Sequence, residues 1–289
     1  MKILFIGVFD VTRQSTNTSQ LLSFKRLDHE IVGYNYRQKA LHIGEAERDK
    51  ELVSVVEKGD YDLVIYSKCN RVAEQTFKEI NKHTKTCLWF MDPLVSYNEE
   101  MKAKTALVDY FCCDKQNVLE EAKNINSNSF YVCEGFDPDV DRPIERSKEY
   151  NVGFIGTLYG NRPAILQQVN HKVNVVSNAY GVAHAEEVAK TKINLNFCTE
   201  AGASDRVYKI LGAKGFLLTD DWRNREAQLI DGKDCVIFKD LEDLNEKIEF
   251  YLRNEEARER IATQGCETIQ QFTRLNWAKK IIALAENIK

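Results

Sequence analysis

Short apolar runs alternate with amphipathic segments along the whole chain. In the first half, apolar runs typical of buried strands are separated by segments with the three- and four-residue spacing of helices. Strands separated by helices predict right-handed βαβ units and a parallel sheet. We therefore predict a Rossmann-like domain over residues 1–140, with strands at 3–8, 31–34, 62–66, 86–91, 110–113 and 130–133.

The stretch from 135 to 149 interrupts this alternation. It contains Pro138 and Pro143 among charged residues, which indicates an interdomain linker. A second series of alternating strands and helices follows, which predicts another Rossmann-like domain over residues 150–272. Its expected strands lie at 151–155, 173–176, 193–197, 216–219 and 235–238.

Arg206 has a distinctive predicted position in this second domain. Apolar residues and asparagines alternate from 193 to 197, and Ser204 or Asp205 is a suitable N-cap for the helix that follows. Arg206 then lies in the first turn of a helix that starts at the carboxyl end of a strand, where open parallel sheets bind ligands. A helix N-terminus with an added guanidinium suits a diphosphate, and the alternative is a surface arginine that pairs with Asp205.

Composition narrows the class of protein. The chain has 289 residues, enough for two domains, and its net charge of −4 disfavours a constitutive nucleic-acid binder, which is usually basic. None of the eight cysteines forms a C-x-x-C pair or a cluster with zinc spacing, which indicates reduced thiols. We expect a cytoplasmic protein, because no secretory signal or apolar run of about 20 residues is present.

The second half resembles the GT-B glycosyltransferases, which have two Rossmann-like parallel-sheet domains facing each other across a cleft. It is similar in particular to the CgeB-like, spore-maturation type, and the resemblance is best over residues 151–275. It rests on the motifs at 151–162 (NVGFIGTLYGNR), 195–196, 205–220 (DRVYKILGAKGFLLTD) and 240–254. The first domain is similar only in layout and in Trp89–Pro93. A phage DNA β-glucosyltransferase has a comparable strand-end aspartate and helix start.

This resemblance implies that the second domain holds a nucleoside-diphosphate sugar as donor substrate. Gly156 and Thr157 would bring backbone close to the phosphates, and Arg162 and Arg206 would neutralise the diphosphate as it leaves. It also implies that the last helix, 273–289, packs back on the first domain. We expect no cofactor or metal, since no D-x-D motif lies at a strand end.

Lys209 departs from the family, which has a glutamate at this position to hold the donor ribose. A lysine cannot accept protons from ribose hydroxyls, although it can reach phosphate. The nucleotide is then held differently, or donor activity is weakened. Glu226, at the start of the next helix, is a substitute for ribose binding or simply a solvated helix-start carboxylate.

Asp92 is the candidate catalytic base. It follows a predicted buried strand and precedes a proline, which places a carboxylate at the edge of the expected cleft. An inverting transfer needs a group to take the acceptor's proton, whereas in a retaining transfer Asp92 only orients the acceptor. The alternative is a turn aspartate that ends a strand.

Two loops of the first domain are candidates for acceptor contacts. The loop after the first strand carries Asp10, Arg13 and Asn17, and the loop after the third strand carries Lys68, Asn70 and Arg71. If these loops face the cleft they touch the acceptor or add positive charge. The alternatives are a solvated loop and a surface cluster at a helix start.

We predict a metal-independent glycosyltransferase that moves a sugar from a nucleotide sugar to an unknown acceptor, which is a sugar, a protein or a modified nucleic acid. One alternative is a protein of the same fold that senses a nucleotide or nucleotide sugar with little turnover, which Lys209 favours. Another is a phage-type DNA-modifying transferase, which the acidic charge opposes. His184 and Trp222 either contact the donor or pack in the interior.

Overall fold

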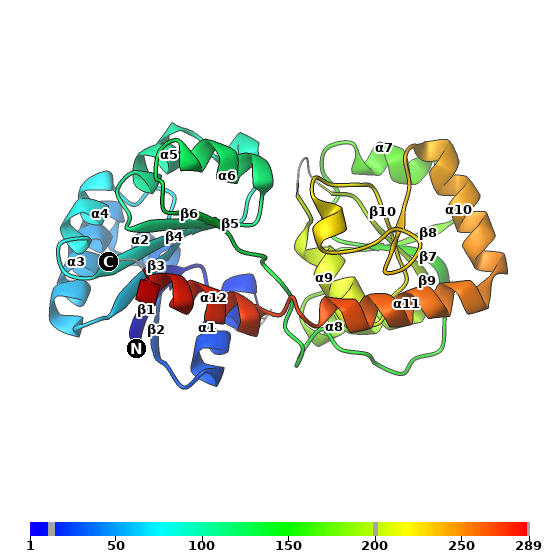
Figure 1. Ribbon diagram of the computed structural model, residues 1–289, viewed down its shortest axis with the longest axis horizontal. Helices are drawn as coiled ribbons and strands as arrows, with labels where there is room; N and C mark the ends of the chain where they lie inside the picture. The colour runs from blue at the N-terminus through cyan, green and yellow to red at the C-terminus, as the bar shows by residue number, and fades with distance from the viewer. Residues whose placement is uncertain (11–14, 199–201, 288–289) are drawn as a thin grey trace. The chain divides into compact units, whose positions relative to one another are not determined.

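The computed structural model describes residues 1–10, 15–198 and 202–287, with the side chain of Glu226 excepted (Figure 1). The chain forms two compact units. The first comprises Met1–Glu134 together with Arg274–Lys289, and the second comprises Gly135–Thr273.

The first unit is built on a six-stranded sheet with the order β2-β1-β3-β4-β5-β6, in which all neighbours are parallel. The chain crosses to one side of β1 and then builds outward on the other, so the order reverses between β1 and β3. Loops at the carboxyl ends of these two strands therefore flank the switch point, where open α/β sheets bind ligands. The strands are β1 (Lys2–Gly7), β2 (Glu30–Asn35), β3 (Leu63–Ser67), β4 (Lys85–Phe90), β5 (Tyr110–Cys113) and β6 (Ser129–Tyr131).

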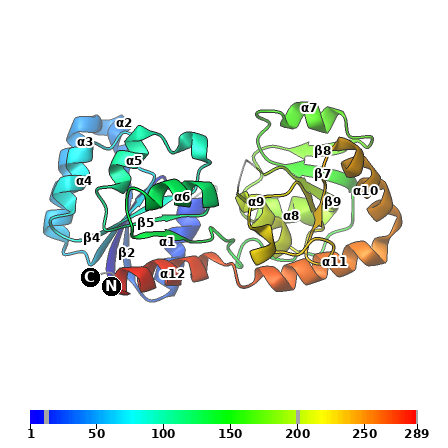
Figure 2. The same ribbon diagram turned by 45° about the horizontal axis from the view of Figure 1, so that its top comes forward.

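Helices cover both faces of this sheet (Figure 2). One face packs against α3 to α6, and the other packs against α1 and α12, because alternate residues of each strand point to opposite faces. The helices are α1 (Thr16–Arg26), α2 (Tyr36–Ile43), α3 (Glu45–Gly59), α4 (Glu74–Ile80), α5 (Glu99–Thr105), α6 (Gln116–Lys123) and α12 (Arg274–Asn287), with a 3-10 turn η1 (Leu94–Ser96).

The last helix, α12, is an integral part of the first unit. Its Trp277 is buried, and the indole ring lies 5.3 Å from the ring of Phe24, 5.4 Å from that of Trp89 and 6.3 Å from that of Phe5, between ring centroids. Helix α12 therefore covers part of the sheet face that also packs against α1.

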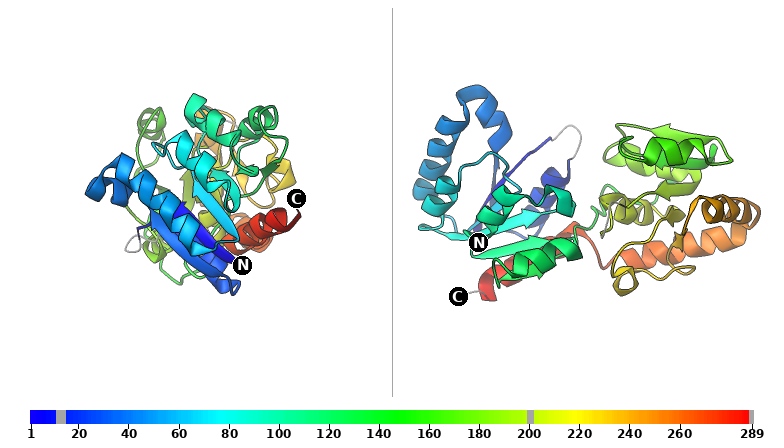
Figure 3. Two further views of the ribbon diagram at one scale, coloured as in Figure 1. Left: turned by 90° about the vertical axis from the view of Figure 1, so that its left-hand side faces the viewer. Right: turned by 90° about the horizontal axis from the view of Figure 1, so that it is seen from above.

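The second unit contains a five-stranded parallel sheet with the order β11-β10-β9-β7-β8, which reverses between β7 and β9 (Figure 3). One apolar core cluster of this unit lies on the face that packs against α7, α10 and α11. The strands are β7 (Tyr150–Ile155), β8 (Val173–Val176), β9 (Thr191–Asn196), β10 (Leu217–Thr219) and β11 (Val236–Ile237). The helices are α7 (Arg162–Gln167), α8 (Val182–Lys190), α9 (Asp205–Gly212), α10 (Leu241–Arg253) and α11 (Glu255–Ile269), with a 3-10 turn η2 (Arg225–Ala227).

Three local expectations differ from the structure. The segment expected to be a linker belongs to the second unit, where Phe136 is buried and its N–H donates to the carbonyl of Phe272 at 3.2 Å. Helix α2 was not expected; it begins directly after β2, where the side chain of Asn35 caps it. The helix expected to start at Glu226 is only the turn η2. Within the described ranges, no helix has the length and apolarity that crossing a membrane requires.

Candidate functional site

Two arginines converge at the carboxyl edge of the second unit's sheet. Arg162 is the first residue of α7, which follows β7, and Arg206 is the second residue of α9, which follows β9. These strands flank the switch point. Both guanidinium groups lie near the ring of Phe154 in β7, whose centroid is 5.8 Å from Cζ of Arg162 and 4.9 Å from Cζ of Arg206.

Arg162 is fixed by backbone carbonyls. Its Nη1 donates to the carbonyl of Thr157 at 3.2 Å, and its Nη2 donates to the carbonyl of Phe197 at 3.2 Å. The ring of Tyr159 stacks on the guanidinium of Arg162, and its centroid lies 4.0 Å from Cζ of that arginine. The side chain therefore joins the loop after β7 to the end of β9 and is only 4% exposed.

Arg206 is held by a side-chain amide. Its Nε donates to Oδ1 of Asn196 at 3.1 Å, and its Nη1 lies 3.4 Å from the carbonyl of Ile155. Asn196 also accepts from the hydroxyl of Ser204, the N-cap residue of α9, and donates to the hydroxyl of Thr219 at 2.9 Å. Sequence analysis did not assign a role to Asn196, although its polar side chain at the end of an apolar strand was a visible signal.

Neither guanidinium forms an ion pair with a carboxylate of the described residues. Burial and the nearby charge of Arg162 lower the pKa of Arg206, and Asp205 only partly compensates. Two like charges that are held close together and largely withdrawn from water are unfavourable unless an anion joins them. The arrangement therefore favours a strongly anionic ligand at this edge.

The other four residues predicted to bind the donor are Gly156, Thr157, Lys209 and Glu226. Gly156 lies beside Arg206, but its N–H donates to the carbonyl of Val176 at 2.9 Å and is not available to a phosphate. Thr157 is exposed. Lys209 forms an ion pair with Asp205 one turn earlier on α9, at 2.6 Å, so its charge is matched within the helix. The backbone of Glu226 lies in η2, and its side chain is outside the described part of the chain.

His184 and Trp222 both pack in the interior. Trp222 is 6% exposed, which opposes stacking on a ligand base. His184, on α8, is also buried, and neither ring nitrogen has a hydrogen-bond partner among the described residues. Burial, together with the charges of Lys209 and Arg206, lowers the pKa of His184 to about 3. A neutral imidazole therefore lies close to the arginine site.

Asp92 follows β4 at the carboxyl edge of the first unit's sheet. Both of its carboxylate oxygens accept from Nζ of Lys68 at 2.9 Å, and about a third of its side chain is exposed. Asp114, which sequence analysis did not single out, follows the neighbouring strand β5. Burial raises the pKa of Asp114, against the opposing charge of Lys115, which pairs with it at 2.6 Å. Asp92 is thus the more accessible carboxylate of the two.

The predicted acceptor residues of the first loop are not all available to a ligand. Asn17 is buried, and its amide accepts from the N–H of Val8 at 3.1 Å and donates to the hydroxyl of Ser67 at 2.8 Å. It joins the loops on the two sides of the switch point. Asp10 is partly exposed, and Arg13 lies outside the described residues.

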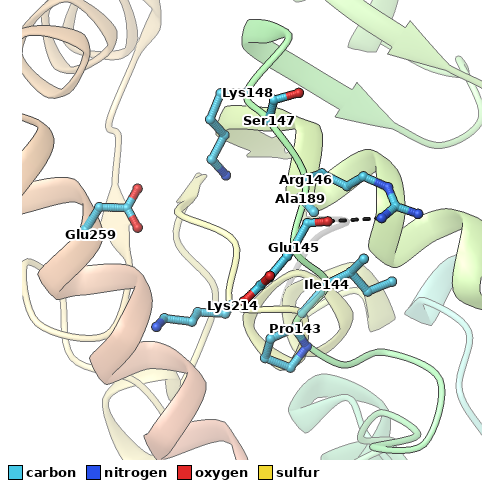
Figure 4. A pocket seen from close by; sticks show the side chains of 10 residues that line it. Pro143, Ile144, Glu145, Arg146, Ser147, Lys148, Ala189, Lys214 and Glu259 are labelled. Atoms are coloured by element: carbon cyan, nitrogen blue, oxygen red, sulfur yellow. Dashed lines mark hydrogen bonds between the residues drawn. The ribbon is translucent and has the colours of Figure 1, made fainter.

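A large cavity of about 720 Å³ lies at the opposite edge of the second unit's sheet (Figure 4). It is lined by the segment that leads into β7, including Arg146 and Lys148, and by Lys214 just after the end of α9. Those positions mark the amino edge of a parallel sheet, away from the switch point at which such sheets bind ligands. The volume alone does not make it the functional site.

Residues 141–283 match the family described as Glycosyl transferase-like, a segment just under half of the chain that includes every strand of the second unit. Comparison with curated proteins finds no match. HepE from Anabaena, solved with UDP-glucose, superposes with a TM-score of 0.70 at 10% identity over 99% of both chains. A glycosyltransferase from Rickettsia africae superposes with a TM-score of 0.71 at 11% identity, over 99% of this chain and 98% of its own.

An α-glucosyltransferase solved with UDP-glucose and DNA containing an abasic site also superposes, with a TM-score of 0.70 at 8% identity over 99% of both chains. At such identities the likeness shows the fold. The protein has the GT-B fold, and with the family match this defines it as a protein of the glycosyltransferase class.

Proposed function

We propose that this protein transfers a sugar from a UDP-sugar to the hydroxyl group of an acceptor. The observation that carries the proposal is the pair of guanidinium groups at the β7/β9 switch point, the buried Arg162 and the partly buried Arg206, neither of which has a carboxylate partner among the described residues. A nucleoside diphosphate supplies the missing negative charge. The UDP-glucose in the structures of HepE and the α-glucosyltransferase supports uridine as the base.

The two arginines would act mainly on the leaving group. As the bond between the sugar's anomeric carbon and the diphosphate breaks, negative charge grows on the diphosphate, and fixed cations stabilise this state more than the ground state. These cations supply the positive charge, so we propose a reaction that needs no metal ion. The 205–220 motif supports assignment to the CgeB-like type.

Asp92 is the proposed base. In an inverting reaction the acceptor oxygen bonds to the anomeric carbon while its proton passes to the carboxylate of Asp92 and UDP departs. Lys68 holds that carboxylate through both of its oxygens, which fixes its direction. In a retaining reaction Asp92 orients the acceptor instead.

The competing proposal is a protein that binds the nucleotide sugar without turnover. Lys209 favours it, because it stands where the family has a ribose-binding glutamate. A thermal-shift series with nucleotides and nucleotide sugars tests binding. UDP at 100 times its dissociation constant should stabilise the protein by about 2.7 kcal/mol. UDP release from UDP-sugars then separates an enzyme from a sensor, and failure of every nucleotide to stabilise the protein would refute both.

A further inference from the structure

A second pocket, of about 540 Å³, lies within the first unit, where the chain leaves the carboxyl ends of β2 and β3. Its wall includes Tyr36, Arg37, Glu45, Arg48, Asn70 and Arg71. Tyr36 and Arg48 are buried and form the floor, whereas Arg37, Glu45 and Arg71 are exposed at the rim. The volume is in the range of small-molecule sites.

The pocket has excess positive charge. Arg48 is neutralised by Asp49, with 2.6 Å from Nε to the carboxylate, but Arg37 forms no ion pair with any carboxylate in the described ranges. Nε of Arg37 instead donates to the hydroxyl of Tyr36 at 3.2 Å. Glu45 is the only carboxylate on the wall, and it lies 3.8 Å from Nη1 of Arg71, too far for a hydrogen bond.

A rigid loop forms one side of the pocket. Lys68, Cys69 and Arg71 all have left-handed backbone, with φ of 60°, 56° and 61°. Such conformations are unfavourable by about 1–3 kcal/mol each and persist only where the surroundings enforce them. Here two buried cations do so: Arg48 donates to the carbonyl of Arg71, and Lys104 donates to that of Cys69 at 2.9 Å.

The side chains of this loop reach both the proposed base and the pocket. Lys68 points to Asp92, the proposed base, while Asn70 and Arg71 line the pocket. The Oδ1 atom of Asn70 is shielded from solvent and has no hydrogen-bond partner among the residues described. A free amide oxygen accepts a hydroxyl proton, and two rim guanidinium groups bind a carboxylate or phosphate.

We propose that this pocket binds the acceptor and that the acceptor is a small hydroxylated molecule that carries a carboxylate or a phosphate. The proposal rests on the proposed sugar transfer, for which it names the acceptor class. The anionic group lies between Arg37 and Arg71, and a hydroxyl of the acceptor donates to Asn70.

The test is calorimetric titration of the full chain with glucose 6-phosphate, glucuronate and neutral glucose. At least one of the two anionic sugars should bind more than tenfold tighter than glucose, and which one binds tells phosphate from carboxylate. The double variant Arg37→Gln/Arg71→Gln should weaken that binding by about tenfold or more, because each charged hydrogen bond contributes about 1.5–3 kcal/mol. Arg26→Gln, at an exposed arginine on α1 of the same unit, is the matched control.

Glu45→Gln provides a test in the opposite direction. It removes the one carboxylate of the wall, so anion binding should tighten by about threefold, a gain that damage to the fold would not produce. Equal affinity for glucose and for both anions, or equal anion binding by the double variant and the wild type, would overturn the proposal. UDP binding is measured on the wild type in the same series, and its absence would refute the proposed transfer instead.

Discussion

Gly156 provides the space that the guanidinium of Arg206 occupies. A Cβ atom at position 156 would lie 2.2 Å from Nη1 of Arg206, and the backbone there has φ of +152°, which residues with side chains rarely adopt. The N–H of this glycine is bonded to β8, and its missing side chain leaves room for the guanidinium. It allows the arginine to approach the end of β7.

Gly156→Ala is therefore expected to displace Arg206 and weaken UDP binding by about tenfold or more, since one charged contact with the diphosphate is lost. The backbone strain should also lower the free energy of unfolding by about 1–3 kcal/mol. Titration with UDP and chemical denaturation measure the two effects. Gly160→Ala is the control, because that glycine also has positive φ, at +61°, but nothing lies within 4 Å of its added Cβ. Similar UDP affinities for the two variants would argue against the steric explanation.

Arg206→Gln and Arg162→Gln should each lower kcat/KM for UDP-sugar turnover by about 10²–10³-fold, which corresponds to a loss of about 2.7–4 kcal/mol in transition-state stabilisation. Steady-state UDP release measures this. Arg253→Gln, at an arginine that is 79% exposed on α10, should leave turnover unchanged. A loss in only one of the two variants would contradict joint binding of the diphosphate.

Asp92→Asn should reduce turnover by about 10²–10⁴-fold while UDP affinity stays at the wild-type value, because a general base acts on the acceptor's proton and not on the donor. Asp114→Asn is the comparison, since that carboxylate is buried against Lys115 and out of reach of an acceptor. Full turnover by the Asp92 variant would exclude it as the base. A retaining reaction would give that result.

His184 is expected to make the second unit less stable in acid. The unfolded imidazole takes up a proton near pH 6.5, whereas the folded one stays neutral down to about pH 3. Below pH 6.5 the unfolded state binds more protons than the folded state. The free energy of unfolding therefore decreases by about 1.4 kcal/mol for each pH unit of acidification between pH 6.5 and about pH 3, whereas above pH 6.5 the contribution of His184 is fully present. Denaturation at pH 5 and pH 7 should differ by less in His184→Leu than in the wild type. His42→Leu, at an exposed histidine on α2, is the control and should keep the wild-type difference.

Trp277→Ala should destabilise the first unit by about 3–5 kcal/mol, the range for a large buried aromatic, because its indole contacts three other rings. Denaturation followed by fluorescence measures this, with Val95→Ala, at a side chain that is 79% exposed, as the control. A loss below about 1 kcal/mol would show that α12 contributes little to the sheet face that it covers.

Much of the fold follows from local patterns. Alternation of apolar and polar residues with periods of two and of three to four residues predicted every strand of both sheets and most helices, because it depends only on which side of an element faces the interior. The same local logic placed Arg206 in the first turn of a helix at a strand end. Helix α2 was missed because it begins at the residue that follows β2, with no turn residues between them.

The sequence by itself therefore determined the two parallel sheets and the position of Arg206. Only the tertiary structure decided that Arg162 and Arg206 both lie near the ring of Phe154, that Lys209 pairs with Asp205, and that Lys68 holds Asp92. Periodicity fixes which face of an element is buried. It does not fix which side chains from distant segments meet, because that depends on strand order and on the packing of the helices between the strands.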